Sequence, residues 1–415
     1  MNKLERVAIK FDMLGIKYEI IDGCLVRETS EYNSDIYVPY GVEEITSKMM
    51  LMEKMRGSVY IHGDAEIKRF NISCNKGITE LTLDIDVSQC KTGHAMFDRC
   101  RNLVKVDFKR FDTSNFVSMR SMFSWCRKLT KVNIERLNTK SCVTFAGMFE
   151  ECDSLVSLDI STLDTSNVTA VNAMFAGCIR LKNLDTSTLR LPKVTNMAEM
   201  FRECESLTSV DISNLGTTKR LNQVEQLFLG CSELEYVNIT GLNLDNVTST
   251  FKLFAGCSNL REIKGIEGLN VRHLDDMSLM FSDCVRLENI DTSKWITTGD
   301  CMYARMFSKC ESLKSVNIQG FDIEDSYQIQ KLFHMCTKLE ELHIRHFCYN
   351  AKYVDYVTII SAFVNCMSLS RIVIHTTTDS FTDPNELLDM LTNLFQREYL
   401  QIKSIPDIRI QMDMN

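Results

Sequence analysis

Proline is scarce in this chain, with only four in 415 residues, and no low-complexity tract occurs. Both absences argue against long linkers between separate domains. The sequence also lacks any stretch of 18 consecutive apolar residues, which a membrane-spanning helix would need. One continuous folded architecture without a membrane span is therefore expected.

An export signal is also missing from the sequence. Residues 2–14 predict a short amphipathic helix and lack the apolar run of a signal peptide. A cytoplasmic location is expected from this absence, and the alternative is a cell-surface or secreted protein exported by a non-standard route. The net charge of -8 and pI near 5.5 argue against nucleic-acid binding, because phosphate contacts need clustered Lys and Arg.

Motifs of catalysis and metal binding are absent as well. The chain has no phosphate-binding loop, no dinucleotide fingerprint, no His-Glu-x-x-His and no Gly-x-Ser-x-Gly. None of its seven histidines lies near cysteines at a zinc-ligand spacing. A metal role for His343 and His346 is the weaker alternative to a structural one. The sequence predicts a protein that is not an enzyme, with no cofactor and no metal.

What the chain does contain is a repeat marked by cysteine. Eleven of its 17 cysteines recur at steps of 26 or 27 residues, with a last step of 30. A fixed period in this range is typical of a solenoid. The repeated residues are Cys100, Cys126, Cys152, Cys178, Cys204, Cys231, Cys257, Cys284, Cys310, Cys336 and Cys366. Equivalent positions of stacked units lie too far apart for disulfides, so these cysteines are predicted to be buried, inert thiols.

Two apolar periods follow one another within each repeat. Counted from cysteine as zero, apolar residues recur at −10, −7, −4, −3 and 0, as at Val168, Val171, Met174, Phe175 and Cys178. These steps of three and four predict about three turns of helix. After the cysteine, apolar residues at +3, +6 and +8 alternate with polar ones, which predicts a strand with one face inward.

The repeat resembles a known family. The pattern Met-Phe-x-x-Cys-x-x-Leu-x-x-Val-Asp-Ile-Ser, as at residues 200–213, is followed by Leu-Asp-Thr-Ser-Asn-Val-Thr, as at 163–169. Together they resemble the BspA-like leucine-rich-repeat family of bacterial surface proteins, over about residues 94–375. The resemblance implies a curved solenoid and, often, attachment to host proteins or other cells.

The expected fold class is an α/β leucine-rich-repeat solenoid with about eleven regular repeats. A parallel sheet should line one face and short helices the other, with right-handed connections. Residues 1–93 are expected to form an N-terminal cap with degenerate repeats, 94–375 the solenoid, and 376–415 a C-terminal cap.

The candidate binding face is the outward side of the strands. Aspartates recur there at +7, and off-consensus residues interrupt them. Two hypotheses remain open for the aspartates: bonding to local backbone and to Ser at +9, or attraction of a basic partner or a cation. The candidate residues are Asp107, Asp159, Asp185, Asp211, Tyr236, Asp291, His343, Arg345 and Arg371.

The leading functional prediction is a non-enzymatic protein-binding scaffold that uses this face. The expected partner is a protein, without nucleic acid. The second hypothesis is a surface or secreted adhesin that binds host or neighbouring-cell proteins. The third is an enzyme whose site lies in residues 1–93, the stretch irregular enough to contain one.

Overall fold

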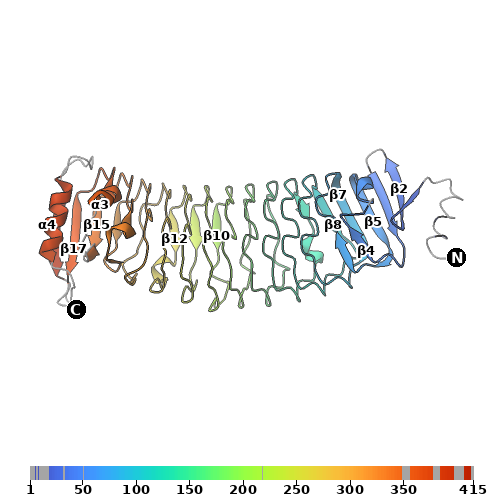
Figure 1. The fold of residues 1–415 in the computed structure, drawn as a ribbon, viewed down its shortest axis with the longest axis horizontal. Helices are drawn as coiled ribbons and strands as arrows, with labels where there is room; N and C mark the ends of the chain where they lie inside the picture. Colours follow the sequence, from blue (N-terminus) through green and yellow to red (C-terminus); the bar gives the residue numbers. More distant parts are fainter. Residues whose placement is uncertain are drawn as a thin grey trace. The chain divides into compact units, whose positions relative to one another are not determined.

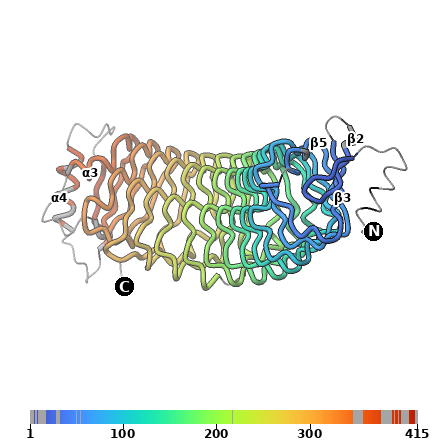
Figure 2. The backbone as a smooth tube through the Cα atoms, turned by 45° about the vertical axis from the view of Figure 1, so that its right-hand side comes forward, coloured from blue at the N-terminus to red at the C-terminus, as the bar shows by residue number. Residues whose placement is uncertain are grey.

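The computed structural model describes residues 5, 8, 18–30, 33–49, 51–216, 218–347, 356–376, 384–396 and 406–412. They fall into two compact units, Met1–Val194 and Thr195–Asn415. Each unit is a β-solenoid with few helices, in which short coils of chain are stacked on one another (Figures 1 and 2). The helix predicted over residues 2–14 lies outside the described residues, apart from two positions.

The first unit opens with an antiparallel hairpin and continues as a parallel sheet. β1 and β2 pair across Asp22 and Gly23, whose φ values of 50° and 78° suit a two-residue hairpin turn. The sheet order is β1-β2-β3-β5-β7-β8-β9, and β4 pairs with β6 in a second, small sheet. The elements are β1 (Glu19–Ile21), β2 (Cys24–Ser30), β3 (Asn33–Val38), β4 (Glu44–Thr46), α2 (Leu51–Lys54), β5 (Gly57–Glu66), β6 (Arg69–Asn71), β7 (Ile78–Asp86), β8 (Lys105–Phe108), β9 (Lys131–Val132) and η1 (Ile134–Arg136).

The described residues of the second unit form three parallel sheets of two to four strands. Their orders are β10-β11-β12, β13-β15-β17-β18 and β14-β16. α4 packs against β17 and β18 at the C-terminal end (Figure 1). The elements are β10 (Ser209–Asp211), β11 (Tyr236–Asn238), β12 (Glu262–Lys264), η2 (Ile266–Gly268), β13 (Ser315–Asn317), β14 (Asp322–Ile323), η3 (Ser326–Ile329), β15 (Glu341–Ile344), β16 (His346–Phe347), α3 (Tyr356–Phe363), β17 (Arg371–Thr376), α4 (Pro384–Phe395) and β18 (Asp407–Met412).

The predicted helices of the repeats are wrong for nearly every coil. Among the described residues, α3, which precedes Cys366, is the only α-helix at this place in the repeat, and the short 3₁₀ helix η3 lies there in the coil of Cys336. In the other coils, residues at −5 and −1 have φ between 51° and 74°, as at Ser121 and Trp125. A right-handed helix needs φ near −63° at every residue, so a left-handed residue at every fourth position interrupts it.

Consecutive tight turns replace these helices. Within one coil, Cys126 N donates to Phe123 O at 3.1 Å, which closes a turn. Between coils, Phe123 N donates to Met148 O at 2.9 Å and Trp125 N to Glu150 O at 2.7 Å. Four-residue turns bring apolar residues to one side at steps of three and four, as a helix does. The periodicity therefore identified the inward residues correctly but not their backbone conformation.

The core is a set of ladders formed by equivalent residues of successive coils. In the first unit the rings of Phe97, Phe123, Phe149 and Phe175 are stacked, with centroids 5.1, 5.4 and 6.0 Å apart. In the second unit a similar ladder runs from Phe201 to Phe363 at 5.3–5.9 Å. The repeat cysteines are buried, as predicted.

The cysteine thiols also have a role that the sequence did not show. Cys126 Sγ donates to the carbonyl of Phe97 at 3.1 Å, and Cys152 Sγ donates to that of Phe123 at 3.2 Å. Each thiol thus links its coil to the preceding one. A weak S–H donor fits here because it is small and apolar enough to be buried and still bonds a buried carbonyl.

Candidate functional site

The outward side of the strands forms an ordered surface in each unit, because equivalent residues are held in parallel register. Tyr236 lies between Ser209 and Glu262 on neighbouring strands. In the first unit, Lys105 lies between Glu80 and Lys131. Neighbouring strands are about 4.8 Å apart, so one ligand can contact several coils at once.

The aspartates at +7 in the first unit are engaged in local turns. Asp159 Oδ1 accepts a hydrogen bond from Ser161 N, and Asp185 Oδ1 from Ser187 N, both at 2.9 Å. Hydrogen bonds from the serines lower the pKa of both carboxyls. The negative charge of Asp159 raises the pKa of Asp185, but this is the weakest of the influences on Asp185. The local bonds therefore outweigh the like-charge repulsion between coils.

The same turn recurs in the second unit. Asp211 Oδ1 accepts bonds from Ser213 N and Oγ at 2.9 and 2.6 Å, and Asn238 Nδ2 of the next coil donates to Asp211 Oδ2 at 2.9 Å. Burial raises the pKa of Asp211, but these bonds outweigh it and leave the pKa lowered. Asp291 binds Ser293 in the same way.

Asp107 is the exception among the aspartates. It lies within β8 and has Lys109 rather than a serine at +9, and its carboxylate forms an ion pair with Lys109 Nζ at 2.8 Å. Asn133 Nδ2 from the next coil donates to Asp107 Oδ1, also at 2.8 Å. Within the described part of the chain, no group of three His, Cys, Asp or Glu residues could hold a metal ion.

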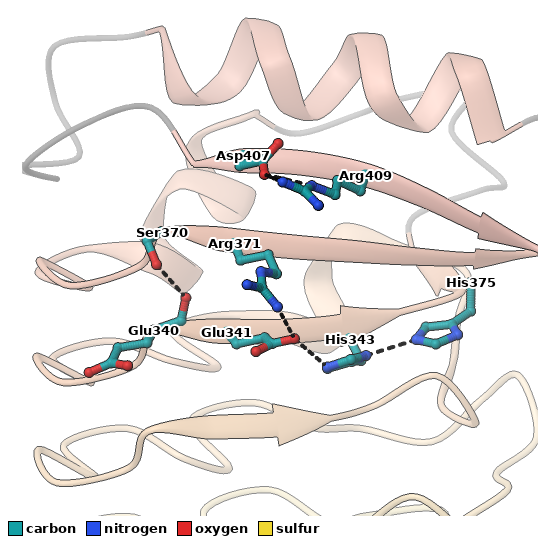
Figure 3. A network of polar contacts seen from close by, with 8 residues as sticks. All are labelled: Glu340, Glu341, His343, Ser370, Arg371, His375, Asp407 and Arg409. Atoms are coloured by element: carbon teal, nitrogen blue, oxygen red, sulfur yellow. Dashed lines mark hydrogen bonds and ion pairs between the residues drawn. The ribbon is translucent and has the colours of Figure 1, made fainter.

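The off-consensus residues of the last coils form a connected polar network (Figure 3). Glu341 Oε1 lies 3.0 Å from His343 Nε2 and 3.3 Å from an Arg371 guanidinium nitrogen. His343 Nδ1 is 2.8 Å from Nε2 of His375, and the two rings are stacked with centroids 5.1 Å apart. The network fixes the positions of His343 and Arg371 on the face.

The remaining predicted residues are Tyr236 and Arg345. Tyr236 opens β11 and is half-exposed, and Arg345 follows β15. The structure thus brings His343 and Arg371 together, and it leaves the aspartates in separate coils. The contact of His343 with His375 was not predicted. His375 lies at +9 in the last coil, and the sequence alone does not show that β15 and β17 are neighbours in this register.

Sequence reasoning missed an aromatic group in the first unit. The rings of Tyr60 and His62 stack at 4.6 Å, and Tyr37 meets His62 edge-on at 5.6 Å. Asp35 Oδ1 is 2.8 Å from His62 Nε2. Burial and the Asp64 carboxylate raise the pKa of Tyr37 to about 12. These residues lie on β3 and β5, whose repeats are too degenerate for their register to be predicted.

A family model matches most of the repeats. The model described as "Mycoplasma protein of unknown function, DUF285" matches residues 91–215 and 222–347, which is more than half of the chain. A search of the curated proteins finds no match.

Solved structures with some similarity include two bacterial proteins. A leucine-rich cell surface protein from Faecalibacterium prausnitzii A2-165 is 17% identical, with a TM-score of 0.32, over 86% of this chain and 94% of that one. The pneumococcal vaccine antigen PcpA is 11% identical, with a TM-score of 0.36, over 95% and 98%. The TLR13–ssRNA13 complex is 15% identical, with a TM-score of 0.26, over 88% and 46%. Among the described residues, no helix is long and apolar enough to cross a membrane.

Proposed function

The chain belongs to the DUF285 family, and from this premise and its strand face we propose that it is a non-enzymatic scaffold that binds another protein. The observation that carries the proposal is a contrast on this face. The aspartates of the regular coils are satisfied by their own serines, whereas off-consensus side chains such as Arg371 stand on the same surface in fixed positions. Tyr and Arg are the residues that most often anchor protein interfaces.

We propose that Tyr236, His343, Arg345 and Arg371 contact the partner in the second unit. The aspartates Asp159, Asp185, Asp211 and Asp291 then serve mainly to shape the turns. In this proposal residues 94–375 carry the binding surface, and 1–93 and 376–415 cover the ends of the core.

Substitution on the face tests this proposal. A Tyr236→Ala, Arg371→Ala variant should no longer retain the partner that the parent chain captures from native lysate. The matched control is Asp185→Asn, Asp291→Asn, which alters the same face at regular positions and should retain it. All three proteins should melt at similar temperatures. An unchanged capture profile in the first variant would sink the assignment of this face.

The narrower assignment to the BspA-like family, and with it an adhesin role, stays a prediction. It requires the native protein at the cell surface, whereas the leading expectation is a cytoplasmic scaffold. Fractionation of the source cells, followed by protease shaving of intact cells, separates the two. Degradation of the protein in intact cells would favour the adhesin.

A further inference from the structure

Charge is distributed very unevenly along this acidic chain. Residues 91–140 contain twelve Lys and Arg against four Asp and Glu, a net charge of +8, whereas the whole chain carries -8. The rest of the chain therefore carries -16. Such a concentration of positive charge in two coils of the first unit favours an anionic ligand at this place.

Five of these cations lie in the two turns that precede β8 and β9 or at the first residue of these strands. Lys105 and Lys131 are direct partners in the parallel register, and Arg101, Arg127 and Lys128 precede them. We call these five residues the basic patch. Lys105 is half-exposed and the other four are exposed. Two like charges on directly opposed strand positions repel each other, so a bound anion would stabilise this arrangement.

Most cations of the basic patch are not neutralised within the protein. Arg127 is the one that pairs with carboxylates in the described structure, with Glu151 at 3.2 Å and Asp153 at 3.8 Å. Arg101, Lys105, Lys128 and Lys131 form no ion pair with any residue that the structure describes. By contrast, Lys109 and Arg110, farther along the same coil, pair with Asp107 and Asp84.

Trp125 holds the arginines of the patch in place. The guanidinium carbon of Arg127 lies 4.6 Å from the centroid of the indole ring, and that of Arg101 lies 6.0 Å from it. Such cation–π contacts restrict a long side chain before a ligand arrives, which reduces the entropy lost on binding. Guanidinium groups held in this way present paired N–H donors that match a carboxylate.

Carboxylates border the basic patch on two sides. Glu80 is next to Lys105 in the register of β7 and β8, and Glu151 and Asp153 occupy the coil after β9. A long polyanion that crossed the coils would meet these negative charges after two coils. The patch therefore matches a short anionic cluster better than an extended nucleic acid.

We propose that the basic patch binds a short acidic segment of the protein partner, with Lys105, Lys131 and Arg101 pairing with its Asp and Glu side chains. This inference rests on the proposed scaffold function and adds the chemistry of one contact. Trp125 is a positioning residue in this proposal, because it acts through Arg101 and Arg127.

Titration of the full chain with a fluorescein-labelled oligo-glutamate peptide tests the proposal. The parent should bind it saturably, more weakly as salt is added, and with a change in Trp125 emission. Lys105→Glu with Lys131→Glu should weaken binding by at least about tenfold, which corresponds to about 1.4 kcal/mol. Trp125→Phe should retain much of the affinity and lose the emission change.

The matched control is Arg180→Glu with Lys182→Glu, which reverses two exposed charges two coils farther along the same unit. It makes the same change in net charge and should bind the peptide as the parent does. Equal weakening in both variants would show that binding depends on net charge and not on the basic patch, and would overturn the proposal. A parent chain that does not bind the peptide would also overturn it.

A single-stranded oligonucleotide of equal net charge provides the second arm of the experiment. Tighter binding of the oligonucleotide than of oligo-glutamate would assign the patch to nucleic acid and overturn the proposal. The scaffold function is tested separately by lysate capture with the Tyr236→Ala, Arg371→Ala variant. If capture succeeds while oligo-glutamate fails to bind, only the inference about the basic patch falls.

Discussion

Two neighbouring pairs of coils in the first unit have the same framework and different surfaces. The coils of Cys100 and Cys126 and those of Cys152 and Cys178 share one ladder of stacked phenylalanines and the same left-handed residues at −5 and −1. Residues 91–140 carry +8, whereas 141–194 carry −2, from four Lys and Arg against six Asp and Glu.

This difference shows that framework and surface are specified by separate positions of the repeat. The inward residues and the cysteine set the packing of every coil, whatever its outward charge. The outward residues at +1, +2 and +5 vary without disturbing that packing. A ligand site can therefore arise in two coils of a solenoid while the others remain purely structural.

The largest expected effect is a difference in thiol reactivity between the exposed Cys74 and the buried repeat cysteines of the shared framework. Burial raises the pKa of the Cys126 and Cys152 thiols, and alkylation needs an accessible thiolate. In native protein, iodoacetamide should modify the exposed Cys74 rapidly and the repeat cysteines of both coil pairs only on unfolding, which costs about 5–15 kcal/mol in ordinary domains. Peptide mass spectrometry measures each site. Rapid labelling of Cys126 but not Cys152 would mean that the basic coils lack the common core.

The next largest effect comes from the phenylalanine ladder. Phe149→Ala removes a fully buried ring between Phe123 and Phe175 and should cost about 3–5 kcal/mol. Phe123→Ala in the basic coils should cost a similar amount, because its surroundings are equivalent. Urea unfolding followed by circular dichroism measures both. The control Val156→Ala alters an exposed side chain and should change stability by less than about 0.5 kcal/mol.

The buried positions of this framework could be predicted from the sequence better than the conformation of its backbone. The step of 26 or 27 residues predicted a solenoid, and Leu155, Phe149 and Cys152 were placed correctly in the core. The turns were mistaken for helices because both structures bring residues at steps of three and four to the same side. The left-handed conformations could not be predicted from residue type, because Trp125 and Glu151 adopt them in this repeat as Gly177 does.

The surface was predictable only in part. A serine two residues after Asp159 or Asp185 pointed to a local turn, and the structure contains those bonds. The pairing of His343 with His375 depends on which coils are adjacent in space and on a lengthened last repeat. The basic patch depends likewise on the approach of Arg101 and Arg127 to Trp125 from different coils.

A smaller effect is expected from the aspartate turns at +7. Asp159 and Asp185 form them in the acidic coils, whereas in the basic coils Asp107 and Asn133 occupy this position and bond each other. Asp159→Ala removes the acceptor for Ser161 N and should lower the melting temperature slightly. Asp159→Asn keeps an acceptor oxygen and should restore most of the loss. If the Ala and Asn variants melt alike, an acceptor oxygen at this position does not stabilise the turn.

The smallest effect is a difference in the sign of the pH dependence of stability between the two pairs of coils. Serine bonds lower the pKa of Asp159 and Asp185 below 3.8, so their contribution is present above the unfolded pKa and is lost as the pH falls through the folded values. In the basic coils, burial raises the pKa of Asp98, the strongest influence, although Arg99 and His94 oppose it. The destabilising effect of Asp98 is therefore absent below the unfolded pKa, grows as the pH rises towards the folded pKa, and is fully present above it.

The two aspartates can be separated by neutral substitutions. Asp98→Asn should raise the free energy of unfolding at neutral pH and leave it nearly unchanged at the lowest pH, whereas Asp159→Asn should make stability less dependent on pH near 3. Urea midpoints measured from pH 2.5 to 7 report both slopes. Equal slopes in the two variants would show that the two pairs of coils do not differ in this respect, because opposite shifts of the folded pKa must change the number of bound protons in opposite directions.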